Sequence, residues 1–531
     1  MGSFRSKAEA EKLHGFSDAL ETTRKPATTF SISRCPYALQ LLLLALLMVV
    51  AALLRFHAIG QKPIWIDEGV SIELARLDWY NFLRTLWRHE ANMTLYYLLL
   101  RAWLPFGSSE GYIRALSVLP SLAAIPAVFA LGRSMFDSRV GLIASFLLTI
   151  NAYDVRYAQE ARSYSLYPFL CILSSIYFLK CLQEPSPRNR VGHVLTSTLG
   201  IYAHFFAGFV VVAQWLSLRL LDRDDLQRPM KKNWRQFAVA VSPIALFIIT
   251  TGTGVVRWIP RPGLSALKDC ALFLTGNGGM LLALGFLAAC ILALLPLFRT
   301  TLVRRVSWES WRYRFLLLWL LFPILFIFLV SQLKPFFLVR YFVFTLPALV
   351  LLAACGLARL RSRWLLACAL IFFAVLSLRA VSSFYQQDFD ISREDWRLAA
   401  RYLLNHAEAG DVVLFHQPIA RMPYEFYRSV IPAATYPKVI YPEHGERLTY
   451  RDFYAGHAKD AFLESVPAQY NRLWVVLIYT QTASGPDPTT RFLTDLFGRE
   501  YTRMQSSEFP GIELRLYERG DAQPTSSAQR R

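Results

Sequence analysis

Long runs of apolar residues, separated by short polar and basic segments, fill the chain up to about residue 385. The first run, residues 37–54, reads YALQLLLLALLMVVAALL. A helix of about 20 apolar residues crosses a bilayer core of roughly 30 Å, and modest tilt accommodates some variation in length. Ten further runs fit this description, namely residues 112–132, 140–153, 163–182, 192–205, 206–221, 236–256, 278–298, 315–333, 341–358 and 364–384. The pattern predicts a polytopic α-helical membrane protein with about eleven transmembrane helices.

Basic residues in the connections predict the orientation. With eleven spans, the Lys and Arg clusters between them all fall on the side of the N-terminus, which the positive-inside rule places in the cytoplasm. The apolar piece 94–106 is too short for a span and fits an interfacial or re-entrant helix. Counting it as a span would move several basic clusters outside. The outer connections are then the 55–111 loop, residues 154–162, 257–278 and 334–340, the neighbourhood of His204, and everything after residue 385.

The chain changes character after residue 388. DWRLAARYLLNHAEAGDVVLF (395–415) predicts a helix that runs into a strand, and RLWVVLIY (472–479) and IELRLYE (512–518) predict two further strands. We therefore expect a small extracytoplasmic α/β domain over residues 386–520. The tail 521–531, rich in Gln, Ser and Thr, has a composition typical of disorder.

Composition agrees with a membrane protein and excludes other classes. The 531 residues are 54% hydrophobic and only 18% charged, whereas soluble proteins are near a quarter charged. The net charge of +19 does not predict a nucleic-acid partner, because Lys and Arg gather in the connections rather than on one soluble face. The cysteines lie in or beside apolar runs, so neither a disulfide framework nor a CxxC metal site is predicted.

An adjacent carboxylate pair, Asp67 and Glu68, follows the first span in the sequence PIWIDEGVSIELAR. An oriented, partly desolvated carboxylate can accept a proton from an attacking hydroxyl. Acidic residues also favour the first turn of a helix for purely structural reasons. The pair alone leaves both interpretations open.

A second outer loop, NAYDVRYAQEARSYSLYPF, favours the functional interpretation. It packs carboxylates, an amide, guanidiniums and a phenol into a short stretch between two spans: Asp154, Arg156, Gln159, Glu160, Arg162 and Tyr164. Arginine binds phosphate bidentately, so this set suits a polar, anionic ligand. Arg156 alone is explained equally well by snorkelling at the membrane boundary.

A third outer element, SQLKPFFLVRYF, carries Lys334, Arg340 and Tyr341, and we expect Lys334 and Arg340 on the same face. Either cation is an interface anchor or part of a clamp for a lipid-linked phosphate. His204 lies at an outer span end and is interpreted as a hydrogen-bonding pocket residue. His89, Glu90 and His204 could share a metal ion, but single histidines without ligand spacing give it little support, so no cofactor is assigned.

The order of five motifs resembles one superfamily. WIDE (65–68), LYYLLLRAW (95–103), RALSVLP (114–120), YAQEARSYSL (157–166) and VRYFVFTLPALVLLAACGLARL (339–360) are similar to the bacterial polyprenyl-phosphate-sugar glycosyltransferases of the GT-C superfamily. The resemblance is closest to the glycosyltransferase family 39 type, which includes protein mannosyltransferases and the aminoarabinose transferases of lipid A. It covers about residues 37–385.

The resemblance implies inverting transfer of a monosaccharide from a polyprenyl-phosphate donor to an acceptor hydroxyl at the outer face. It implies that Asp67 is the base and that Glu68 supports it. Glu160 and Arg162 would line the sugar or phosphate site, and Arg340 would hold the leaving phosphate. Many members have a proline-bearing NxPLYY where this chain has NMTLYY, which puts only the local turn in doubt. The second loop has no clear Asp-x-Asp pair, so metal dependence is not carried over.

These inferences divide the chain into a cytoplasmic segment (1–36), a GT-C-like catalytic membrane domain (37–385, first outer loop 55–111), the extracytoplasmic domain (386–520) and the tail. The resemblance implies the inner (plasma) membrane, with the bilayer, a polyprenyl-phosphate sugar and an acceptor glycan, lipid or protein as partners. The sequence names neither the sugar nor the acceptor.

Two other classes of function are weighed. A transporter or flippase of a lipid-linked glycan would place its ionisable residues near the bilayer midplane, often in related halves. Here the candidate charges gather at the outer ends of spans and no halves are evident. A sensor that binds its ligand through the C-terminal domain would not explain three polar outer elements on the membrane part.

Overall fold

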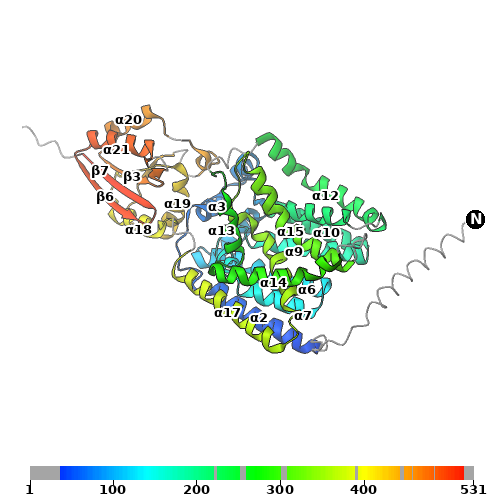
Figure 1. Ribbon diagram of the computed structural model, residues 1–531. Helices are drawn as coiled ribbons and strands as arrows, with labels where there is room; N and C mark the ends of the chain where they lie inside the picture. The colour runs from blue at the N-terminus through cyan, green and yellow to red at the C-terminus, as the bar shows by residue number, and fades with distance from the viewer. Residues whose placement is uncertain are drawn as a thin grey trace, which may run out of the picture.

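A bundle of apolar helices forms most of the molecule, and a small α/β domain lies at one end of it (Figure 1). This computed structural model describes residues 36–220, 224–251, 259–300, 308–388, 393–442, 448–456, 458–482 and 485–519. The segment predicted to be cytoplasmic, apart from its last residue, and the predicted disordered tail lie outside these ranges.

The bundle is built from helices of very different lengths. They are α2 (Tyr37–Phe56), α6 (Glu110–Met135), α7 (Ser138–Thr149), α8 (Ala152–Ala158), α9 (Leu166–Gln183), α10 (Pro187–Ala203), η4 (Phe205–Ala207), α11 (Gly208–Arg219), α12 (Asp224–Thr251), α13 (Leu264–Leu274), α14 (Gly279–Thr300), α15 (Trp308–Val330), η6 (Val339–Thr345), α16 (Leu346–Leu357) and α17 (Arg363–Gln386). Short polar residues between the apolar runs begin several of them: the side chains of Ser109, Asp137 and Asn151 accept backbone N–H groups in the first turns of α6, α7 and α8.

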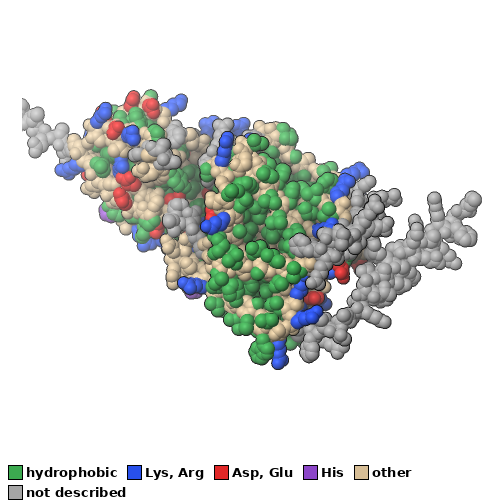
Figure 2. Space-filling model, viewed as in Figure 1, with side chains coloured by type: hydrophobic (Ala, Val, Ile, Leu, Met, Phe, Trp, Pro, Cys, Tyr) green, Lys and Arg blue, Asp and Glu red, His purple; other side chains and the backbone are tan. Residues whose placement is uncertain are grey.

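The prediction of a polytopic membrane protein is confirmed. Among the described residues, six helices are long and apolar enough to cross a membrane, or up to seven if the bent pair Leu264–Leu274 and Gly279–Leu295 is one span. Exposed leucines, isoleucines and phenylalanines of α14, α15 and α17 contribute to the broad hydrophobic surface in Figure 2.

The count of eleven spans is not confirmed. A helix lies at every predicted position, but α7 and α11 have 12 residues each and α10 has 17. At 1.5 Å per residue, a helix of 12 residues is only about 18 Å long, well short of the hydrocarbon core.

The first outer loop folds into short helices between α2 and α6. They are α3 (Ile66–Arg76), α4 (Trp79–Thr85), η2 (Leu86–Glu90), α5 (Thr94–Trp103) and η3 (Leu104–Phe106). The piece expected to be interfacial or re-entrant thus forms α5 and η3, whose apolar residues are too few to cross the core.

The C-terminal domain contains the predicted helix and strands and adds others. Its elements are α18 (Trp396–His406), β1 (Val412–Phe415), η7 (Pro418–Ala420), α19 (Arg421–Val430), β2 (Lys438–Tyr441), η8 (Asp452–Tyr454), α20 (Asp460–Gln469), β3 (Arg472–Leu477), β4 (Gln481–Thr482), β5 (Gly485–Pro486), α21 (Pro488–Glu500), β6 (Arg503–Phe509) and β7 (Ile512–Glu518). The main sheet has the order β2-β1-β3-β7-β6, in which β1 is parallel to β2 and β3, and β7 is antiparallel to β3 and β6.

Helix α19 of this domain packs directly on α3 of the outer loop (Figure 1). A Cβ on Gly69 would lie 2.7 Å from the backbone nitrogen of Pro423, so only glycine allows the observed approach. The Tyr427 hydroxyl accepts the backbone N–H of Ile64 at 2.8 Å and donates to the Glu110 carboxylate. The C-terminal domain is therefore built onto the loop that carries Asp67.

Candidate active site

Asp67 lies in the first turn of α3, where its carboxylate meets two guanidiniums from distant segments. Its Oδ2 is 3.1 Å from Nη1 of Arg340 and 3.9 Å from Nη2 of Arg162. The side chain keeps 23% of its surface exposed, so a ligand can reach it. Burial acts to raise the pKa of Asp67, but Arg340, Arg162 and Arg393 outweigh it and hold the pKa below its usual value. The carboxylate is therefore ionised at neutral pH.

Glu68 points away from Asp67 and is fully buried against α6. Both of its oxygens accept hydrogen bonds from Arg114, at 2.8 and 2.6 Å, and Oε1 also accepts the backbone N–H of Ala161 at 2.8 Å. Arg114 in turn donates to the carbonyls of residues 59, 62 and 63. Glu68 thus fixes α3 to α6 and to the second outer loop, and it supports Asp67 by position rather than by contact with a substrate.

The second outer loop supplies Arg162 and Glu160 between α8 and α9. Nη1 of Arg162 donates to the backbone carbonyl of Asp67 at 3.3 Å and to the Ser71 hydroxyl at 3.2 Å. Glu160 is buried and accepts a hydrogen bond from Arg393 at 2.6 Å. Asp67, Arg162 and Arg340 therefore lie together, and Glu160 is joined to this group through Arg393.

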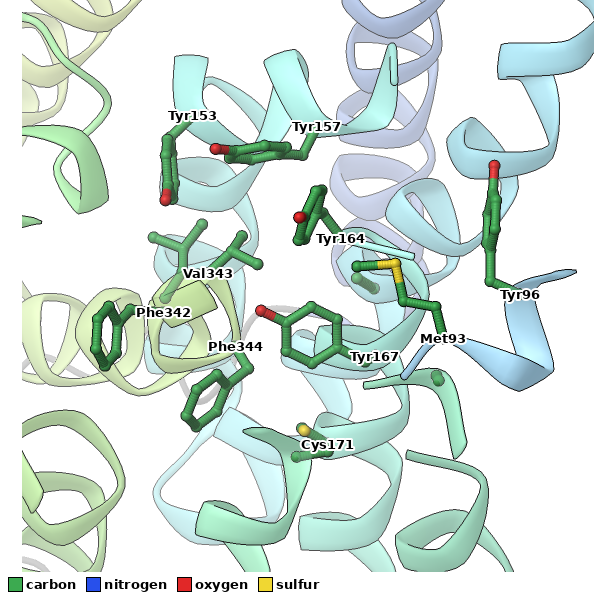
Figure 3. Packing of buried hydrophobic residues seen from close by; sticks show 14 of the residues in the cluster. Met93, Tyr96, Tyr153, Tyr157, Tyr164, Tyr167, Cys171, Phe342, Val343 and Phe344 are labelled. Atoms are coloured by element: carbon green, nitrogen blue, oxygen red, sulfur yellow. The ribbon is translucent and has the colours of Figure 1, made fainter. Parts of the chain in front are cut away.

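A cluster of aromatic rings lies beside these charges. Figure 3 shows Tyr157, Tyr164 and Tyr167 close together in the core beside Phe344 of η6. The rings of Tyr157 and Tyr164 are 4.9 Å apart between centroids. His204 stacks on Tyr167 at 4.6 Å, and its ring lies 5.1 Å from that of Tyr341. The cluster is apolar in body, with phenol groups that can meet a polar ligand.

Three residues assigned to the site from sequence are not brought to it. Asp154 accepts hydrogen bonds from Arg55 at 2.6 Å and from Ser121 at 2.7 Å. Gln159 donates to the backbone carbonyls of Arg55 and His57, so both side chains hold the end of α2, and their role in substrate binding stays a prediction. Lys334 is exposed just after α15, and the turn and extended segment that separate it from Arg340 give no shared helical face.

A cluster of Glu90, Tyr97 and Tyr454 beside Arg162 was not predicted from the sequence. Glu90 accepts hydrogen bonds from Tyr97 at 3.0 Å and from Tyr454 of the C-terminal domain at 3.5 Å, and Nη1 of Arg162 lies 3.5 Å from the Tyr97 hydroxyl. Burial raises the pKa of Glu90. The only sequence signal was the polar pair His89 and Glu90 inside an amphipathic loop, interpreted there as a weak metal site.

In the described part of the chain, no three His, Cys, Asp or Glu side chains come together as a metal site. The two histidines that could share a metal ion have other neighbours: His89 stacks on Tyr454 at 3.8 Å, and His204 on Tyr167.

Several buried polar atoms around Asp67 lack a hydrogen-bond partner among the described residues. They are Trp65 Nε1, Asp67 Oδ2, Glu160 Oε1, Arg162 Nε, the Tyr164 hydroxyl, Arg340 Nε, Arg393 Nε and Glu394 Oε2. A buried polar group without a partner costs about 1–3 kcal/mol, so such groups seldom gather without a ligand to satisfy them. Five of these eight atoms belong to N–H or O–H donors, which suits an anionic, oxygen-rich ligand, and the other three are carboxylate oxygens, which accept hydrogen bonds.

Comparison with known proteins gives the fold. No family model and no curated sequence matches the chain. Among solved structures, ArnT from Cupriavidus metallidurans in the apo state is similar, with a TM-score of 0.59 and 12% identity over 89% of this chain and 97% of that chain. ArnT bound to undecaprenyl phosphate gives 0.57 with the same identity and coverage.

The archaeal oligosaccharyltransferase AglB from Archaeoglobus fulgidus, in complex with an inhibitory peptide and a dolichol-phosphate, is also similar. It gives a TM-score of 0.51 and 10% identity over 84% of this chain and 70% of that chain. Both neighbours are GT-C glycosyltransferases, so this chain has the GT-C fold that the order of its motifs predicts.

Proposed function

We propose that this GT-C protein transfers a monosaccharide from a polyprenyl-phosphate-linked donor to an acceptor hydroxyl at the outer face of the membrane, with inversion at the anomeric carbon. The observation that carries the proposal is the ionised, partly exposed Asp67 carboxylate, held between Arg162 and Arg340. The two similar structures with bound undecaprenyl phosphate and dolichol-phosphate support the donor class.

Asp67 is the base in this proposal. The acceptor oxygen attacks the anomeric carbon while the bond from that carbon to the phosphate oxygen breaks. The phosphate leaves with the electron pair, and the acceptor proton passes to Asp67. One displacement inverts the configuration. A positioned base contributes about 10²–10⁴-fold to such a step.

The guanidiniums serve both the leaving group and the base. A phosphate near Arg340 and Arg162 would gain charge as the sugar bond breaks, and fixed cations stabilise that charge. The same phosphate would screen the two cations from Asp67. Since those cations lower the pKa of Asp67, donor binding would raise its proton affinity when the acceptor arrives.

The side of the membrane is part of the proposal. The positive-inside rule puts the N-terminus in the cytoplasm and the α/β domain outside. The site then lies where a lipid-linked donor, with its tail among the helices, meets an acceptor glycan, lipid or protein at the outer surface of the inner membrane.

The test is turnover of a panel of short-chain polyprenyl-phosphate sugars by the full chain in nanodiscs, scored as released polyprenyl phosphate. Asp67→Asn should lose about 10²–10⁴-fold in rate. Asp495→Asn, an exposed aspartate on α21, is the matched control and should be unaffected. Membrane extract is added as the acceptor source. Release that persists unchanged in Asp67→Asn, with correct insertion, would show that another group is the base.

A panel without turnover by the wild-type protein, even with extract, would contradict the transferase proposal. Movement of a lipid-linked sugar across a liposome bilayer would then be measured as the alternative.

A further inference from the structure

Arg393 begins the described stretch 393–442 of the C-terminal domain, and its side chain lies against the membrane domain beside the candidate site. Nη2 of Arg393 is 2.6 Å from Oε2 of Glu160, and Nη1 is 3.5 Å from Oδ2 of Asp388. The guanidinium also lies over the Trp65 ring, 4.1 Å from the centroid. Trp65 immediately precedes α3, which carries Asp67.

The next residue, Glu394, also faces α3. It is buried, and one of its oxygens accepts a hydrogen bond from Tyr479 at 2.9 Å. The Trp65 side chain does not cap α3, so the first turn of this helix has no local cap of the usual kind. The negative Glu394 carboxylate beside the helix start is favourable for the exposed N–H groups there.

We propose that Arg393 is a positioning residue of the active site, supplied by the C-terminal domain, which holds Trp65 and Glu160 in place beside Asp67. The proposal rests on the function proposed above. In it, the C-terminal domain completes the site as well as facing the outer surface where an acceptor would arrive.

The surroundings distinguish this role from a simple tether. Arg397, four residues after Arg393, is a tether: it donates to the carbonyls of Gly60, Gln61 and Lys62 and pairs with Glu110. Arg393 instead adds a third positive charge to the field at Asp67 and lowers the pKa of that carboxyl together with Arg340 and Arg162.

The other charged and titratable groups that act on Asp67, or on which it acts, come from every element around it. They are Arg162 and Arg340, the carboxyls of Glu90 and Glu394, and the phenols of Tyr97, Tyr164 and Tyr341. Loss of Arg393 leaves two cations against these acids, so the pKa of Asp67 rises.

The test compares full-length Arg393→Gln, Arg393→Lys and Arg397→Gln in nanodiscs. Since the base works in its ionised form, the acid limb of the pH profile for transfer should move to higher pH by about one unit in Arg393→Gln. Arg393→Lys keeps the charge and should restore most of the profile. Arg397→Gln should lower thermal stability without moving the limb. A limb that stays in place in Arg393→Gln would overturn the proposal.

Hydrogen exchange tests the positioning without a need for turnover. The peptide that spans residues 64–70 should exchange about tenfold faster in Arg393→Gln than in wild type, as expected when a helix start loses its support. Peptides from α2 should not change. Unchanged exchange at 64–70 would overturn the proposal even if transfer is measured. Faster exchange in a protein that shows no transfer would support the positioning role of Arg393 and contradict only the transferase assignment.

Discussion

Replacement of Gly69 by alanine tests whether the close packing of α3 against α19 of the C-terminal domain fixes the position of Asp67. The added Cβ would lie 2.7, 2.8 and 2.9 Å from the N, Cα and Cδ atoms of Pro423. Ordinary contact begins near 3.4 Å, so α3 and α19 must separate by about 0.7 Å at this point. The neighbour is largely backbone and cannot swing aside.

Two energies oppose each other in Gly69→Ala. Overpacking of a tight contact costs about 1–3 kcal/mol, and alanine returns about 1 kcal/mol of helix propensity relative to glycine. The net change in the free energy of unfolding is therefore small. Catalysis is far more sensitive, because a misplacement of about 1 Å costs on the order of 10²-fold. We expect transfer to fall by about that factor while the melting temperature changes little.

The assay measures released polyprenyl phosphate and thermal unfolding on the same preparation in nanodiscs. Gly498→Ala on α21 is the matched control, because a Cβ there meets no atom within 4 Å. Wild-type transfer in Gly69→Ala would refute the argument that α19 sets the place of Asp67. A large fall in the melting temperature, with a proportional loss of activity, would contradict the expected small change in the free energy of unfolding.

Three further predictions concern charged residues of the site and Glu73 on α3. Glu68→Gln leaves the buried Arg114 without its counter-charge and should cost about 3–5 kcal/mol in stability, seen as a lowered melting temperature; an unchanged melting temperature would argue against the anchor role. Arg340→Ala should reduce the rate of transfer by about 10²–10³-fold while Arg340→Lys keeps part of it, measured as kcat, and equal loss in both would point to geometry rather than charge. Burial, with help from Glu425, raises the pKa of Glu73 to about 7 from 4.5, so its contribution to stability is complete below about pH 4.5 and is lost as pH rises through 7. Melting temperatures from pH 5 to 8 should therefore fall less in Glu73→Gln than in wild type, and parallel curves would contradict this.

The sequence predicts the parts of the site that local structure decides. Asp67 and Glu68 follow a span and begin a helix, as their acidic pattern indicates. What the pattern does not decide is which carboxylate faces the ligand. Successive helix residues point about 100° apart, and only the packing of α6 turns Glu68 to Arg114 and leaves Asp67 to Arg340.

Long-range contacts are the part that the sequence does not predict. Arg393 and Tyr454 reach the site only because the C-terminal domain packs back on α3, and no periodicity in their own segments indicates that. The pairing of Asp154 with Arg55 was not predicted, because Arg55 lies at the end of a strongly apolar run and looks like an ordinary boundary residue. Lys334 is separated from Arg340 by a turn and an extended segment after α15, and no pattern in SQLKPFFLVRYF indicates this geometry.

The additional strands show the same limit within the C-terminal domain. β6 reads RMQSSEF and is mostly exposed at the edge of the sheet, so it lacks the alternation that marks a half-buried strand. β2 has only four residues. Both are defined by their pairing with β7 and β1 rather than by their own pattern.

The hydrogen bonds from Arg114 and Arg397 to the backbone of residues 59–63 have a consequence for how the protein is synthesised. Arg114 of α6 binds these residues from the helix bundle. Arg397 binds them from the C-terminal domain, which is synthesised later. On the proposed topology, that domain must first be exported. A nascent chain that has inserted its helices but not yet exported its last part has the contacts of Arg114 and lacks those of Arg397 and Arg393. On the proposed function and topology, the site is therefore complete only once the last domain has been synthesised and exported.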